Sequence, residues 1–274
     1  MREKILITVK TYPVPSKKYD ELVCTAGINE QGEWRRLYPI PFRKLQDDSQ
    51  FQKYTWIEVD IEPRDRDYRA ESYRPISEIN CIGQISTQNE WQERRRIILK
   101  EVHTNFDILI KEAKINNKSL AVFKPREIKD FKVEPISREW DPDIIASIAI
   151  NRQHPQLFDN DKTPEEFFKI VRKLPYKFSY QFQCDCKQCI NGKTHTLMNE
   201  DWEIGALYWQ YYDKTGDETL ACKKVKEKFY HEFLKKDLYF FVGTTFEHHN
   251  TAKNPFIIIG TFYPPKILQR TLDF

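Results

Sequence analysis

Residues 176–203 read YKFSYQFQCDCKQCINGKTHTLMNEDWE, and the rest of the chain is best understood around them. Aromatic and polar residues alternate over Tyr176–Gln183, which is the period-two pattern of a half-buried strand. Three cysteines and a histidine follow, and the stretch ends in Asp201-Trp202-Glu203, where a helix is expected to begin. No other part of the sequence collects so many chemically capable side chains.

The cysteines and the histidine have a spacing that suits one metal ion. The pattern is Cys-x-Cys-x2-Cys-x5-His, and its members are Cys184, Cys186, Cys189 and His195. Zinc takes about four thiolate or imidazole ligands at tetrahedral angles, and the Asn191-Gly192 turn can bring the histidine back toward the thiols. The spacing matches neither the common two-pair zinc finger nor the retroviral zinc knuckle. We therefore predict a closed, structural zinc site at residues 184–195, with Cys222 as a reserve ligand. The alternative is a group of reduced thiols without a ligand role.

The composition indicates a folded chain without a membrane segment. Charged residues make up 31% of the 274 positions and aromatic residues 14%, and the net charge is only +3, so bulk charge does not indicate a nucleic-acid partner. No apolar run reaches the roughly 18–20 residues of a membrane helix, and the N-terminus lacks the features of a signal peptide. We therefore expect a cytoplasmic protein without membrane partners, whose six cysteines stay reduced.

The N-terminal part is predicted to be rich in β-structure. Short strands are expected at residues 5–9, 22–26, 33–38 and 54–61, separated by proline-rich and turn segments. This spacing indicates a small bent sheet or barrel over residues 1–88. Its pattern of short strands resembles that of PUA-like barrels, a class of small barrels that hosts base-recognition pockets.

Residues 89–274 are predicted to form an α+β domain that carries the metal loop. Helices are expected over 90–114, 163–172, 201–212 and 218–236. Strands are expected in 119–136 and 176–183, and the runs LYFFVGT and FIIIGTFY are expected to be neighbouring antiparallel strands. The predicted class of the whole chain is therefore α+β. Residues 85–120 are either a domain junction or a change of element inside one fold.

Basic and aromatic side chains are interleaved in the N-terminal part. Arginine forks bind phosphates and base edges, and aromatic rings stack on bases. The predicted nucleic-acid-binding residues are Lys10, Tyr12, Lys17, Lys18, Arg35, Arg36, Arg43, Arg66 and Arg69. The alternative is an ordinary charged surface, because acidic residues nearly balance the basic ones. DNA and RNA are equally open as partners.

Asp201 and Glu203 are the weak candidates for catalysis. Two carboxylates and His195 beside a divalent ion would suit a metal-dependent nuclease or a related phosphodiester hydrolase, with His248 and His249 as more distant candidates. The simpler interpretation places the carboxylates in the first turn of a helix, where the macrodipole favours them. The sequence contains no Walker-type loop, GxGxxG, GxSxG or HExxH motif, so enzyme activity stays an open question.

Three functions therefore compete. The leading one is an intracellular nucleic-acid-binding protein with a structural zinc site. The second is the nuclease that would use His195, Asp201 and Glu203. The third is a protein-interaction subunit of a multi-protein bacterial system, whose aromatic surface would dock on a partner.

Overall fold

The computed structural model describes residues 1–16, 20–40, 50–152 and 171–267. Three of the predicted nucleic-acid-binding residues, Lys17, Lys18 and Arg43, lie outside the described residues. Most of the helix predicted at 163–172 lies outside them as well.

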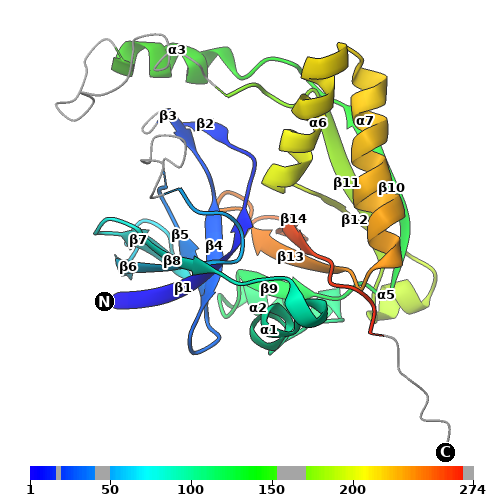
Figure 1. Cartoon of the computed structure of the whole chain (residues 1–274), viewed down its shortest axis with the longest axis horizontal. Coiled ribbons are helices and arrows are strands. Elements are labelled where there is room, and N and C mark those ends of the chain that lie inside the picture. The colour runs from blue at the N-terminus through cyan, green and yellow to red at the C-terminus, as the bar shows by residue number, and fades with distance from the viewer. Residues whose placement is uncertain (17–19, 41–49, 153–170, 268–274) are drawn as a thin grey trace, which may run out of the picture.

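Five strands of the N-terminal part form a closed barrel (Figure 1). In pairing order they are β1 (Arg2–Lys10), β4 (Thr25–Asn29), β5 (Trp34–Leu37), β7 (Ser72–Pro75) and β6 (Thr55–Pro63). The ring closes because β6 pairs with both β7 and β1, and β8 (Asn80–Gln84) extends the sheet beyond β6. The core of the barrel is aliphatic and includes Ile5, Ile57 and Ile61. The predicted small barrel is confirmed. A separate short hairpin follows β1 and consists of β2 (Val14–Ser16) and β3 (Asp20–Leu22).

Two three-stranded antiparallel sheets form the framework of the C-terminal part. One has the order β10 (Glu127–Pro135), β11 (Tyr176–Gln183) and β12 (His195–Met198). The other has the order β14 (Phe256–Phe262), β13 (Tyr239–Thr244) and β9 (Leu120–Phe123). The alternating aromatic stretch is therefore the central strand β11, as predicted, and the two C-terminal apolar runs are neighbouring antiparallel strands. The α+β class is confirmed.

Helices flank the sheets of the C-terminal part. They are α1 (Gln88–Ile98), α2 (Phe106–Lys114), α3 (Pro142–Arg152), the single turn α5 (Lys187–Ile190), α6 (Trp202–Thr215) and α7 (Glu218–Lys226). After α7 the chain continues as the π-helix η3 (Glu227–Glu232) and the 3-10 turn η4 (Phe233–Lys235). Helices α6 and α7 lie side by side along β10 and β11 (Figure 1). Their apolar residues join the strand aromatics in one core, to which Tyr180, Tyr208 and Phe229 contribute fully buried rings.

The single helix predicted over 90–114 is wrong, because the structure has two helices there, α1 and α2. The segment between them runs along β9, where the His103 N–H donates to the Val122 carbonyl at 2.9 Å. The carboxamide of Asn105 then accepts hydrogen bonds from the N–H groups of Asp107 and Ile108 and caps α2. The cap and the pairing with β9 together outweigh the helical spacing of the apolar residues.

The two parts of the chain share a hydrophobic core. Residues of β1 and β4, among them Leu6 and Ile28, pack with Val122, Phe241 and Phe262 of the β9–β13–β14 sheet. The end of β1 also meets the start of α6, since the Tyr12 N–H donates to the Glu200 carbonyl at 2.8 Å. Among the described residues, no helix is long and apolar enough to cross a membrane.

Candidate functional site

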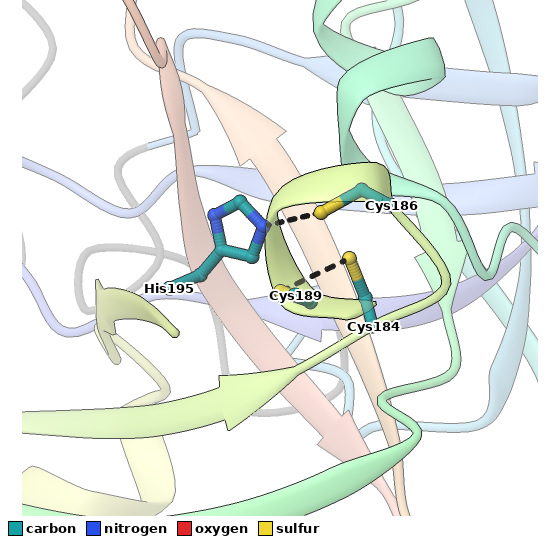
Figure 2. Close-up of side chains that lie close together, drawn as sticks. All are labelled: Cys184, Cys186, Cys189 and His195. Carbon is teal, nitrogen blue, oxygen red and sulfur yellow. Dashed lines mark hydrogen bonds between the residues drawn. The ribbon is translucent and has the colours of Figure 1, made fainter. Parts of the chain in front are cut away.

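The three cysteines and the histidine come together at one end of β11 (Figure 2). Strand β11 delivers Cys184, and Cys186 then occupies the N-cap position of α5, which contains Cys189. Gly192 adopts a φ of +87°, a conformation that side chains disfavour, and lets the chain turn back. Strand β12 then begins at His195, which pairs with Phe182 of β11. The hairpin register thus returns the imidazole to the thiols.

Two of the spacings between the ligand atoms are close to those of a tetrahedral metal site. All four lie within 4.8 Å of one another, and the three cysteines are fully buried. Cys186 Sγ is 3.3 Å from His195 Nε2, and Cys184 Sγ is 3.8 Å from Cys189 Sγ. Metal–sulfur bonds of about 2.3 Å and metal–nitrogen bonds of about 2.0 Å at tetrahedral angles give edges of roughly 3.8 Å for sulfur–sulfur and 3.5 Å for sulfur–nitrogen. The cluster can therefore hold one metal ion, with four protein ligands and no open position.

Burial sets the protonation of the cluster when no metal is bound. Burial raises the pKa of the Cys184 thiol to about 12 and also raises the pKa of Cys189, so without a cation both thiols stay protonated. Burial lowers the pKa of His195, which keeps its ring neutral and able to donate a lone pair. Cys222 belongs to α7 and is not part of the cluster within the described residues.

The loop around the cluster is tied to the segment before α2. The Asp185 N–H donates to the Thr104 carbonyl at 2.9 Å, and Asn105 Nδ2 donates to the Asp185 carbonyl at 3.2 Å. The rings of Phe106 and Phe182 lie 5.1 and 5.6 Å from the His195 ring. A metal ion here would hold together α2, β11 and β12, which is a structural role.

Asp201 and Glu203 lie at the junction with the barrel. Asp201 is 1% exposed and caps α6 by accepting from the Glu203 N–H at 3.1 Å. Lys53 Nζ is 2.5 Å from Asp201 Oδ1 and 3.5 Å from Glu203 Oε1, while the Thr261 N–H donates to Asp201 Oδ2 at 3.1 Å. Burial alone would lower the pKa of Lys53, but the two carboxylates raise it, so the ammonium stays charged. In the described part of the chain these carboxylates do not join His195, and the nuclease arrangement is not supported.

Four of the predicted nucleic-acid-binding residues have buried side chains with partners inside the protein. Arg35 is 9% exposed and forms two hydrogen bonds with Glu3. Arg36 is 2% exposed and donates to the hydroxyl and carbonyl of Ser119 at 2.7 and 3.2 Å. The two others are Arg69 and Lys10.

Arg69 forms two hydrogen bonds with Asp67 and donates to the Thr244 carbonyl at 2.5 Å. Lys10, which is 8% exposed, donates to the Phe51 carbonyl at 3.0 Å. Through Ser119 and Thr244, the buried arginines link the barrel to the C-terminal part. Their role in binding nucleic acid stays a prediction.

Two further predicted residues occupy different surroundings. Tyr12 is half-buried, and its hydroxyl donates to the Arg172 carbonyl and accepts from Trp209 Nε1, both at 2.8 Å. Arg66 is exposed on the loop between β6 and β7. Among the predicted residues that the structure describes, Arg66 is thus the one whose side chain is fully at the surface.

Tyr68, on the same loop as Arg66, forms an exposed aromatic pair with Phe246 of the loop between β13 and β14, and sequence analysis missed this pair. Tyr68 is 44% exposed and Phe246 is 50% exposed, their ring centroids are 5.5 Å apart, and the Tyr68 hydroxyl donates to the Phe246 carbonyl at 3.2 Å. Arg69 lies under Phe246, with Cζ 5.8 Å from the ring centroid. We call Arg66, Tyr68 and Phe246 the Tyr68–Phe246 surface, and the buried Arg69 lies beneath it. No local sequence pattern could have found the pair, because its members are far apart in the chain.

A buried histidine supports the Tyr68–Phe246 surface from below. His249 is fully buried, its ring lies 5.6 Å from that of Tyr68, and Nδ1 is 2.8 Å from the Thr244 hydroxyl. Burial, together with Arg69 and Arg36, lowers the pKa of His249, so the ring is neutral. Within the described residues its Nε2 atom has no hydrogen-bond partner.

Two family models together cover nearly the whole chain. One, "Domain of unknown function (DUF8758)", matches residues 1–100, and the other, "Domain of unknown function (DUF8757)", matches residues 101–273. None of the curated proteins matches the chain. The solved "Structure of murine DNA binding protein bound with ds DNA" covers 98% of both chains at 8% identity and a TM-score of 0.29, a likeness too low to support an argument.

Proposed function

The chain belongs to the family described as "Domain of unknown function (DUF8757)". We propose that this member of the family is a nucleic-acid-binding protein stabilised by a structural zinc ion. The observation that carries the binding function is the exposed aromatic pair of Tyr68 and Phe246, next to Arg66 and above Arg69. Exposed rings beside arginines are how proteins hold unstacked bases and the phosphates that connect them.

The Tyr68 ring is held in place before any ligand binds. The Tyr68 hydroxyl donates to the Phe246 carbonyl, and the Tyr68 carbonyl accepts from Asn116 Nδ2 at 2.6 Å. Fixed rings lose little conformational entropy when a base stacks on them. Because stacking does not depend on base identity, we expect single strands to bind better than duplexes and with little sequence preference. Whether DNA or RNA is preferred is a question for the same experiment.

Zinc is the metal that this donor set favours. Three thiolates and one imidazole in a tetrahedral arrangement are typical of structural zinc sites. The closed coordination shell and the buried sulfurs support a structural rather than a catalytic ion. An intracellular, reducing location is part of this proposal, because the thiols bind metal only while they are reduced.

The binding function is tested by fluorescence anisotropy with labelled single-stranded and double-stranded DNA and RNA. We expect affinity to fall steeply between about 50 and 200 mM salt, because phosphate contacts release counterions. The variant Tyr68→Ala/Phe246→Ala is expected to weaken single-strand binding about tenfold or more, since each stacked base contributes about 1–3 kcal/mol.

Two matched variants serve as controls for this experiment. Ile82→Ala removes an exposed apolar side chain of β8, and Arg74→Ala removes an exposed arginine of β7. Both controls are expected to keep full affinity. Absence of salt-sensitive binding to every oligonucleotide would sink the proposal, and a stable protein partner lost in the Tyr68→Ala/Phe246→Ala variant would favour the protein-interaction alternative.

A further inference from the structure

A second group of aromatic and basic side chains surrounds a cavity of about 450 Å³ beside α6. Its rings belong to Trp140, Trp209 and Tyr212, and its basic groups to Arg138, Arg172 and Lys173. We propose that this cavity binds a nucleoside monophosphate unit, with the base stacked on the Arg172 guanidinium that lies over Trp209 and the phosphate among the basic groups. The volume lies within the range of about 300–1,000 Å³ that small-molecule sites occupy.

The aromatic rings are fixed in orientation by hydrogen bonds at their edges. Trp209 Nε1 donates to the Tyr12 hydroxyl at 2.8 Å, and Trp140 Nε1 donates to the Val171 carbonyl at 2.7 Å. Tyr212 meets Trp209 edge-on, with centroids 5.7 Å apart and planes at 79°. Both indole N–H groups are therefore occupied, and the rings form a fixed aromatic wall for the groups that lie against them.

The positions of the cations distinguish between charged ligands. Arg172 Cζ lies 3.9 Å from the Trp209 centroid, and Lys173 Nζ lies 5.5 Å from the Trp140 centroid. A cage of empty aromatic faces would favour a quaternary ammonium, but here the protein's own cations already occupy those faces. A base can instead stack on the flat guanidinium, and its phosphate can accept hydrogen bonds from the arginine and the lysine.

The carboxylates near the cavity do not block a phosphate. Arg172 forms two 2.7 Å hydrogen bonds with Asp213, and Arg138 pairs with Glu218. The side chains of Arg138 and Arg172 are 63% and 52% exposed, so solvent screens both ion pairs and a phosphate can compete with the carboxylates. Each guanidinium also has donors left over, because arginine carries five N–H groups.

The test is a titration of the full chain, followed by tryptophan fluorescence and calorimetry, with adenosine monophosphate, adenosine, inorganic phosphate and choline. We expect adenosine monophosphate to quench the fluorescence and to bind about tenfold more tightly than adenosine, because only the nucleotide engages the basic groups. The variant Arg138→Gln/Lys173→Gln is expected to lose that tenfold advantage. The control Arg74→Gln, on an exposed arginine of β7, is expected to keep it.

Several results would overturn the proposal. These are no binding of adenosine monophosphate at millimolar concentration, equal binding by the Arg138→Gln/Lys173→Gln variant, or tighter binding of choline than of the nucleotide. Competition by a 5′-phosphorylated oligonucleotide, but not by its 5′-hydroxyl form, would assign the site to a strand end. Competition by neither would assign it to a free nucleotide, and both results support the site. The proposal does not rest on the Tyr68–Phe246 surface, so Tyr68→Ala/Phe246→Ala is expected to leave nucleotide affinity unchanged.

Discussion

At the scale of single residues, the chain places charged side chains in its interior and gives each one a partner. Asp201 shows how much one side chain contributes there. It caps α6, pairs with Lys53 across the junction, and accepts from the N–H of Thr261 on β14. Removing one member of a buried ion pair leaves the other charge unpaired, which costs far more than the pair itself contributes.

We therefore expect Asp201→Asn to lower the free energy of unfolding by about 3–5 kcal/mol, because the buried Lys53 ammonium would keep only the more distant and partly exposed Glu203 as a counter-charge. Urea unfolding measures this value. The control is Glu203→Gln, whose side chain is 36% exposed and lies 3.5 Å from Lys53, and which is expected to cost less than about 1 kcal/mol. Equal effects of the two substitutions would contradict this account of the junction.

Asp67 predicts a dependence of stability on pH. Burial would raise the pKa of this carboxyl, but its hydrogen bonds with Arg69 and its attraction to that charge outweigh burial and lower the pKa from 3.8 to about 2. At pH values between these two pKa values, the unfolded chain binds more protons than the folded one. The contribution of Asp67 to the free energy of unfolding is therefore complete above a pH of about 4 and falls as the pH drops toward 2.

We expect Asp67→Asn to reduce the total change in unfolding free energy across that pH window by an amount on the order of 2 kcal/mol. The comparison of wild type with the variant isolates Asp67 from other carboxyls that titrate at similar pH. Parallel curves for the two proteins would show that the Asp67–Arg69 pair does not contribute.

At the scale of elements, the β11–β12 hairpin is the unit that forms the metal site. The strand register and the turn at Gly192 determine where the four ligand atoms lie. Because the loop also bonds to Thr104 and Asn105, loss of the ion is expected to loosen the start of α2 as well as the hairpin.

Elemental analysis of the purified protein is expected to find about one zinc per chain. Cys186→Ser and His195→Ala are each expected to reduce the zinc content and the melting temperature, and a chelator to lower the melting temperature of the wild type, because the ion contributes directly to folding. The control Cys222→Ser, on α7, is expected to keep its zinc. Retention of zinc and stability by both ligand variants would rule out the site as described.

At the scale of the whole molecule, the barrel and the C-terminal part form one packed unit. They share a hydrophobic core, and Arg36, Arg69 and Lys53 of the barrel bond to Ser119, Thr244 and Asp201. The boundary between residues 88 and 89 stays a prediction. Ile97 and Ile98 of α1, on the C-terminal side of this boundary, contribute to the shared core.

We expect the two parts to unfold together in a single transition, because separating them would expose the shared core and break the contacts of Lys53 with Asp201 and of Arg36 with Ser119. Tryptophan fluorescence and far-ultraviolet circular dichroism measured during urea unfolding are expected to give coincident curves. Two separated transitions would show that the parts are independently stable.

Local features of the sequence determined much of this protein. The alternation in Tyr176–Gln183 predicted the central strand β11, and the spacing of Cys184, Cys186, Cys189 and His195 predicted a cluster that the structure brings together. The helix start at Asp201 was also predicted. Each of these patterns acts over a few neighbouring residues, where backbone geometry alone decides which side chains meet.

Only the tertiary structure decided which charged residues are buried and which aromatic ones are exposed. Arginine is usually a surface residue, but Arg36 is buried and donates a hydrogen bond to Ser119. Tyr68 forms an exposed aromatic pair only because the fold brings Phe246 beside it. The long helix expected over 90–114 likewise gave way to pairing with β9 and to the cap at Asn105. In each case the free energy depends on a partner distant in the chain, and a one-dimensional pattern holds no information about that partner.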